Sequence, residues 1–139
     1  MDYIKMYMNS MRMHLDASLA LLVPGFGAMP RFTMAVYHAG YVIECGLKAL
    51  YLTNHSVSRH ERIVNEEFKK KSRHDLQMTV GLLKKVGLYL PLAQKRNVLS
   101  VRARWTSEMR YQPLATDHTN ALDVLRAAQR FANWLEEFR

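Results

Sequence analysis

The sequence predicts an all-α protein, an antiparallel four-helix bundle with an additional short helix, formed by residues 1–139 as a single domain. Three observations indicate this class. Apolar residues recur at three- and four-residue spacing in the first and last segments, as in amphipathic helices. Residues 34–52 form the most apolar stretch and contain no proline. The four prolines of the chain fall between the expected helices.

The first expected helix covers residues 2–23 and ends at Pro24 and Gly25. We expect Arg12 and His14 to face outward. Its apolar face consists of Ile4, Met8, Met11, Leu15, Leu19 and Leu22. A turn-rich link of residues 24–30 follows, and Pro30 is suited to the first turn of the next helix.

Residues 34–52 are expected to form the central helix, about 28 Å long at the rise of an α-helix. Apolar residues lie on two tracks of this helix, so protein must cover at least two of its sides. A polar stripe shares a third track, with Tyr37, Tyr41, Glu44, Lys48 and Tyr51. Glu44 and Lys48 form either an ordinary pair on a solvated edge or part of a polar seam that faces a pocket or a second subunit.

The segment 58–73 is strongly charged, and we interpret it as a loosely packed excursion with at most one helix, anchored by Ile63, Val64 and Phe68. Its basic end could contact phosphates, although a solvated charge run is the default interpretation of such a segment. This basic end consists of Lys69, Lys70, Lys71 and Arg73. His74 and Asp75 are expected to begin a helix that stops at Gly87.

Two further helices complete the expected fold. One covers residues 92–104, carries Arg102 and Arg104 as a second basic cluster, and directs Leu92, Val98, Leu99 and Val101 inward. The last begins at a cap formed by Thr116 or Asp117. Its inner face consists of Leu122, Leu125, Ala128, Ala132, Leu135 and Phe138, and its outer face of Asp123, Arg126, Arg130, Asn133 and Glu137.

The charge and composition of the chain indicate which partners and which location to expect. A formal charge of +8 favours a polyanion partner, with RNA or DNA first and acidic proteins second, and does not choose between them. The N-terminus lacks the pattern of a signal peptide, and His38, Glu44 and Lys48 interrupt the apolar stretch, so we expect no membrane span and a cytoplasmic protein. Cys45, the only cysteine, is expected to be a small buried hydrophobe.

Common cofactor and metal motifs are missing from the sequence. The six histidines include no pair four residues apart, and the single cysteine completes no zinc set. There is no glycine-rich phosphate loop and no Gly-x-Ser-x-Gly elbow. We therefore expect neither a metal ion nor a cofactor.

Three motifs in order carry a family resemblance. Residues 37–50, YHAGYVIECGLKAL, resemble the second-helix signature of HEPN domains, residues 73–76, RHDL, resemble the start of the next family helix, and residues 109–113, MRYQP, resemble the turn before the last one. The resemblance covers about residues 10–138. It implies the helical bundle expected above, a homodimer, and a nucleotidyltransferase or other defence-system protein as partner.

The resemblance leaves two functions open. The first is a non-catalytic module that binds RNA or a nucleotide, in which Tyr41, Glu44, Lys48, His74 and Tyr111 shape a pocket. The second is a metal-independent ribonuclease.

In family ribonucleases an arginine neutralises the scissile phosphate and a histidine transfers a proton. The resemblance places these roles on Arg110 and His118, with Glu44 orienting them. Here the two residues lie further apart than in the family motif, and Pro113 stands between them. Arg110 and Tyr111 could instead be structural, with the guanidinium capping helices. The longer spacing favours the binding module.

Overall fold

The computed structural model describes residues 1–22, 30–69, 76–105 and 117–138. All regular secondary structure in these ranges is helical, which confirms the all-α class. The elements are α1 (Tyr3–Ala20), α2 (Pro30–Thr53), α3 (Val57–Arg62), the π-helix η1 (Ile63–Phe68), α4 (Leu76–Lys85), α5 (Leu92–Arg102) and α6 (His118–Phe138).

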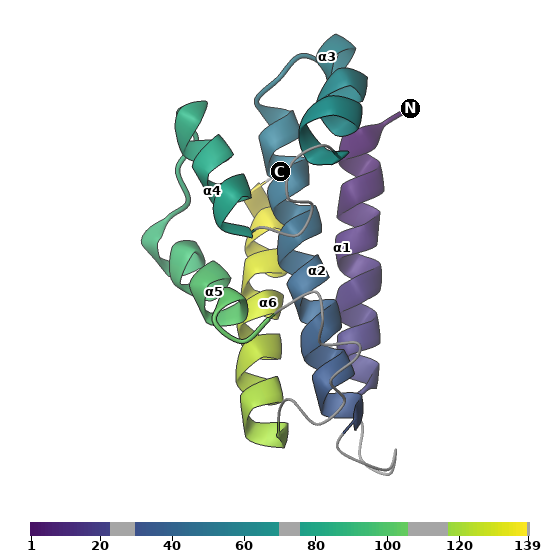
Figure 1. Cartoon of the computed structure of the whole chain (residues 1–139), viewed down its shortest axis with the longest axis vertical. Helices are drawn as coiled ribbons and strands as arrows, with labels where there is room; N and C mark the ends of the chain where they lie inside the picture. The colour runs from purple at the N-terminus through teal and green to yellow at the C-terminus, as the bar shows by residue number, and fades with distance from the viewer. Residues whose placement is uncertain (23–29, 70–75, 106–116, 139) are drawn as a thin grey trace.

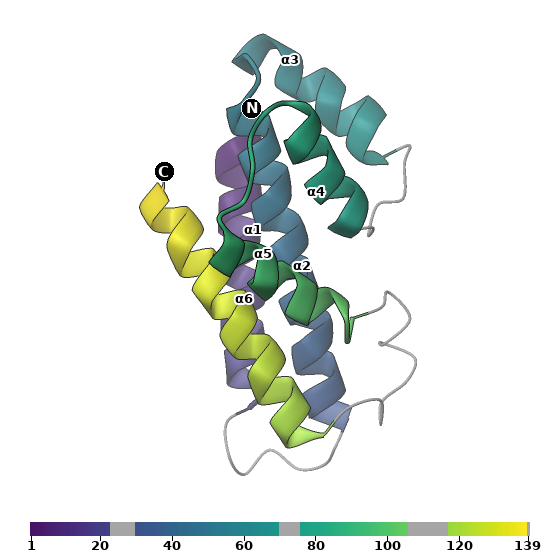
Figure 2. The same cartoon turned by 90° about the vertical axis from the view of Figure 1, so that its left-hand side faces the viewer.

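The helices α1, α2 and α6 run along the long axis of the molecule, and α4 and α5 lie beside them (Figure 1). The most extensive helix pair is α1 with α2, and α6 packs on both α2 and α5. α1 runs antiparallel to α2, as expected. α6 runs in the same general direction as α2 and crosses it at an angle, so only part of the expected antiparallel pattern is present (Figure 2).

Local signals place the helix ends. The Asp2 carboxylate accepts a hydrogen bond of 2.9 Å from the Lys5 backbone N–H at the start of α1. Asp117 caps α6 in the same way, with 2.9 Å to the Asn120 N–H, as the sequence predicts. After α4, Gly87 adopts a φ of 81°, a conformation that glycine reaches without steric cost.

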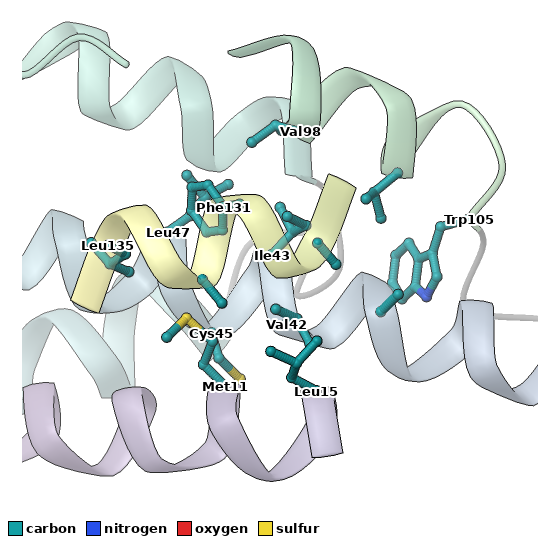
Figure 3. Close-up of a cluster of buried hydrophobic side chains, with 14 of the residues drawn as sticks. Met11, Leu15, Val42, Ile43, Cys45, Leu47, Val98, Trp105, Phe131 and Leu135 are labelled. Carbon is teal, nitrogen blue, oxygen red and sulfur yellow. The ribbon is translucent and has the colours of Figure 1, made fainter. Parts of the chain in front are cut away.

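The hydrophobic core surrounds the middle of α2. Figure 3 shows Met11 and Leu15 of α1 on one side of this helix and Phe131 and Leu135 of α6 on the other. Protein therefore covers both apolar tracks of α2, as predicted. Gly46 allows α6 to approach closely, because an added Cβ would lie 2.5 Å from Phe131. α2 is longer than expected and begins at Pro30, in agreement with the role predicted for this proline.

Several predicted core positions are wrong. The exposed fraction is 64% for Leu92, 44% for Leu99, 38% for Leu19 and 52% for Phe138. α5 buries only the narrow face that carries Val98 and Val101, so its neighbouring leucines point away from the core. Phe138, in the last turn of α6, stacks on Trp134 at 5.2 Å instead of entering the core.

Residues 57–69 are helical. α3 continues directly into η1, and the three predicted anchors Ile63, Val64 and Phe68 are buried. The expected helix and its three anchors are therefore confirmed for these residues, and the remainder of the segment lies outside the described residues. Among the described helices, none combines the length and the apolar character needed to cross a bilayer.

Candidate functional site

The polar stripe of α2 divides into two parts, and the first is a buried ion pair. Lys48 Nζ lies 3.4 Å from Glu44 Oε1, and the side chains are only 13% and 5% exposed. The Lys48 ammonium also lies over the rings of Tyr7 (5.8 Å) and Phe68 (5.4 Å). The interpretation of this pair as a solvated edge is wrong, because α1 and η1 cover it.

The surroundings of the pair are also desolvated. Burial, followed by the neighbouring Cys45 and Glu44, raises the pKa of Tyr7 to about 12. Burial also raises the pKa of the Cys45 thiol to about 12, so this buried cysteine stays neutral, as expected of a core residue. These groups hold α1, α2 and η1 together within one chain.

The second part of the stripe, Tyr37 and Tyr41, belongs to an aromatic cluster, which we define as these two tyrosines with His14, His38 and Trp105. The hydroxyls of Tyr37 and Tyr41 lie 2.9 Å apart, and Trp105 Nε1–H donates to the backbone oxygen of Tyr37 at 2.9 Å. His14 stacks on Tyr41 with ring centroids 5.1 Å apart. The expectation that His14 faces outward is therefore wrong, whereas Arg12 is exposed and forms an ion pair with Glu136 at 2.6 Å.

A pair of histidines lies at the edge of this cluster. His14 Nδ1 and His38 Nδ1 are 3.0 Å apart, and both rings are half-buried. Burial lowers the pKa of both groups, and the neighbouring His38 lowers that of His14 further. Spacing in the sequence indicates only histidine pairs within one helix, so it gives no sign of this pair between α1 and α2.

A basic cavity lies between α5 and α6. This arginine groove has a volume of about 320 Å³. Its lining residues are Asn97, Ser100, Arg104, Asp123, Arg126, Ala127 and Arg130. Three arginines thus surround a polar cavity that contains a single carboxylate, and the arginine side chains belong to exposed residues.

The groove includes only part of the predicted nucleic-acid contact. Arg104 lines it, whereas Arg102 is exposed on α5 outside the lining. Lys69 is exposed at the end of η1, and its ammonium donates to Asn65 at 3.3 Å. The sequence placed Arg126 and Arg130 on the outer face of the last helix without assigning them a role. Their four-residue spacing, which places both arginines on one face of the helix, is the feature of the sequence that indicates a shared site.

The predicted catalytic pair cannot be assembled from the described residues. Arg110, Tyr111, His74, Lys70, Lys71 and Arg73 all lie outside them. His118 is exposed at the first position of α6 and makes an edge contact with Phe32 at 5.3 Å. Of the predicted pocket residues, Glu44 and Lys48 form the buried pair, and Tyr41 belongs to the aromatic cluster.

Within the described ranges, no three His, Cys, Asp or Glu side chains gather in a group that could hold a metal ion.

Comparisons with known proteins gave no match to a family model, to a curated protein or to a solved structure.

Proposed function

We propose that this chain is a non-catalytic RNA-binding module with a HEPN-like helical arrangement, and that the arginine groove is its RNA contact. The observation that carries the proposal is the convergence of Arg104, Arg126 and Arg130 on one polar cavity. A guanidinium presents several N–H donors in one plane and binds phosphate oxygens two at a time. The charge of +8 adds long-range attraction for a polyanion.

The resemblance extends the proposal to the setting of the module. We propose a homodimer in the cytoplasm that acts beside a nucleotidyltransferase or another defence-system protein. Light scattering of the purified chain tests the dimer directly, because one chain has a mass of 16.2 kDa. A monomer at the concentrations used for RNA binding would contradict that part of the proposal.

The groove makes a specific salt prediction. Each phosphate contact to a single strand contributes about 0.7 to the slope of log K against log salt. Replacement of Arg126 or Arg130 by Gln is expected to weaken RNA binding and to reduce that slope by about 0.7 for each arginine. Fluorescence anisotropy with a labelled single-stranded RNA at several salt concentrations measures both quantities.

A matched control separates the groove from general charge. Arg59→Gln removes the same charge from the exposed face of α3, outside the groove. This variant should keep the salt slope of the parent protein. Equal effects of Arg59→Gln and Arg126→Gln would contradict the groove as the RNA contact.

The alternative function is a metal-independent ribonuclease that uses Arg110 and His118. It is tested with the same RNA in the presence of a chelator, with Arg110→Ala and His118→Ala prepared in parallel. Cleavage by the parent protein that both substitutions abolish would replace the non-catalytic module by the ribonuclease. Absence of cleavage, or cleavage that survives both substitutions, removes these two residues as catalysts.

A further inference from the structure

The contact between His14 and His38 is a head-on one. The ring centroids lie 5.3 Å apart and the two Nδ1 atoms 3.0 Å apart. The centroid distance exceeds the nitrogen distance by about two ring radii, so each Nδ1 lies close to the line that joins the rings. Each nitrogen therefore points at the other, which is the geometry of an N–H···N hydrogen bond.

The same geometry argues against a chelated metal ion in this arrangement. Two imidazoles that bind one ion at about 2.0–2.1 Å direct their lone pairs at the ion and not at each other. If the ion stood on the line between the rings, the nitrogens would be about 4 Å apart. The observed 3.0 Å leaves room for a proton alone.

One shared proton has a defined consequence. When one Nδ1 carries a hydrogen, the other must present its lone pair, so the accepting ring is neutral and bears its hydrogen on Nε2. A single added proton can still be held, as an imidazolium that donates to an imidazole. Protonation of both rings places two N–H groups head to head and two positive charges about 3 Å apart, and the hydrogen bond is lost.

We infer that His14 and His38 form an acid-sensitive tie between α1 and α2, which holds while their facing nitrogens share one proton and opens when both rings are protonated. The two rings belong to the most extensive helix pair of the molecule. Tyr41 stacks on His14 and packs edge-on against Trp105, with ring centroids 5.7 Å apart. Opening of the tie therefore also disturbs the packing of Trp105, which follows α5.

The described groups that face the tie are aromatic rings, and none of them offsets a second charge. From α2, the pair is faced by the phenol rings of Tyr37 and Tyr41. Among the described residues, neither imidazole lies within ion-pair distance of a carboxylate. The Nδ1 atoms of the two imidazoles lie 3.0 Å apart, so a second positive charge would directly face the first.

The sign of the pH effect follows from the lowered pKa of both rings. The unfolded chain binds protons on these histidines at a higher pH than the folded chain does, so stability rises with pH across that interval. The contribution of the tie is complete above about pH 6.5 and is lost as the pH falls below it. Each unit by which a folded pKa lies below 6.5 is about a tenfold loss in the folding equilibrium constant at low pH.

His14→Asn is the decisive variant. An amide can still pair with His38 Nδ1, and because it carries no charge it accepts from a protonated His38 as readily as it donates to a neutral one. Between pH 7.5 and pH 5, the melting temperatures of the parent protein and of the exposed control His118→Ala should fall. The melting temperature of His14→Asn should fall clearly less over the same range. An equal loss in His14→Asn would overturn the tie, and His38→Asn provides the same test from the other helix.

Two further measurements distinguish a proton shared by His14 and His38 from a purely structural contact and from a metal site. In the parent protein, histidine titration followed by NMR should show two separate steps for the pair, the second coinciding with loss of amide exchange protection along α1 and α2. Coincident steps without a change in protection would refute the inference. Stabilisation of the parent by Zn²⁺ that His14→Asn abolishes would also overturn it, since the pair would then be a metal site.

Discussion

Gly40→Ala tests the close packing of Trp105 on α2. A Cβ at position 40 would overlap the indole of Trp105, which is 7% exposed and is held by its hydrogen bond to Tyr37. Overpacking of this kind costs up to about 3 kcal/mol. Alanine in a helix interior is favoured over glycine by about 1 kcal/mol, so the expected net loss of stability is about 2 kcal/mol.

The same substitution should reverse its sign when the indole is removed. In a Trp105→Ala background nothing opposes the helix propensity, and Gly40→Ala should stabilise by about 1 kcal/mol, a coupling of about 3 kcal/mol between the two sites. Urea unfolding of the four proteins, followed by circular dichroism, measures this cycle. Gly81→Ala is the control, since its Cβ meets no described atom within 4 Å. Equal effects of Gly40→Ala in both backgrounds would refute the packing argument.

Three other predictions concern single side chains. Lys48→Met should destabilise by about 3 kcal/mol in urea unfolding, because it removes the cation of a buried ion pair with Glu44, and adding Glu44→Leu should recover most of the loss. Cys45 in the folded protein should react with a thiol reagent at pH 8 at least about tenfold more slowly than in urea, because burial raises the pKa of its thiol to about 12; rapid labelling would contradict its burial. Asp117→Ala should cost about 1 kcal/mol through loss of the cap on Asn120, whereas the exposed Asp123→Ala should change stability by less than about 0.5 kcal/mol.

Features that depend on neighbours in the sequence were predictable. The cap at Asp117, the stop at Gly87 and the first-turn position of Pro30 each follow from local backbone chemistry. The two apolar tracks of α2 were also readable, because helical spacing alone decides which residues share a face. Helix periodicity leaves open how wide a face the partner helices cover, which is why Leu92 and Leu99 were placed inward.

Features that depend on how helices rotate against one another were not predictable. His14 and His38 are 24 positions apart in the sequence, and they meet only because α1 turns that edge toward α2. The arginine groove likewise needs the crossing of α5 and α6, which brings Arg104 beside Arg126 and Arg130. Charge and spacing identified some of these residues as exposed cations, and no local rule could pair them across helices.

The polar stripe of α2 explains how a buried helix can tolerate so many polar groups. Along its length every part of the stripe meets a specific polar partner. Tyr51 donates to Glu67 at 3.4 Å, Lys48 pairs with Glu44, and the hydroxyl of Tyr37 pairs with that of Tyr41. Two of these contacts lie within α2, whereas the hydrogen bond from Tyr51 to Glu67 of η1 and the stacking of Tyr41 on His14 of α1 depend on how the helices are rotated against one another. Apolar residues would pack against α1 in several rotations of similar energy, and these contacts between helices are satisfied in one rotation only. We therefore expect the stripe to fix the register of α1 and η1 on α2 more than it adds to total stability, so that a fully apolar stripe would give a stable protein with less well-defined helix packing.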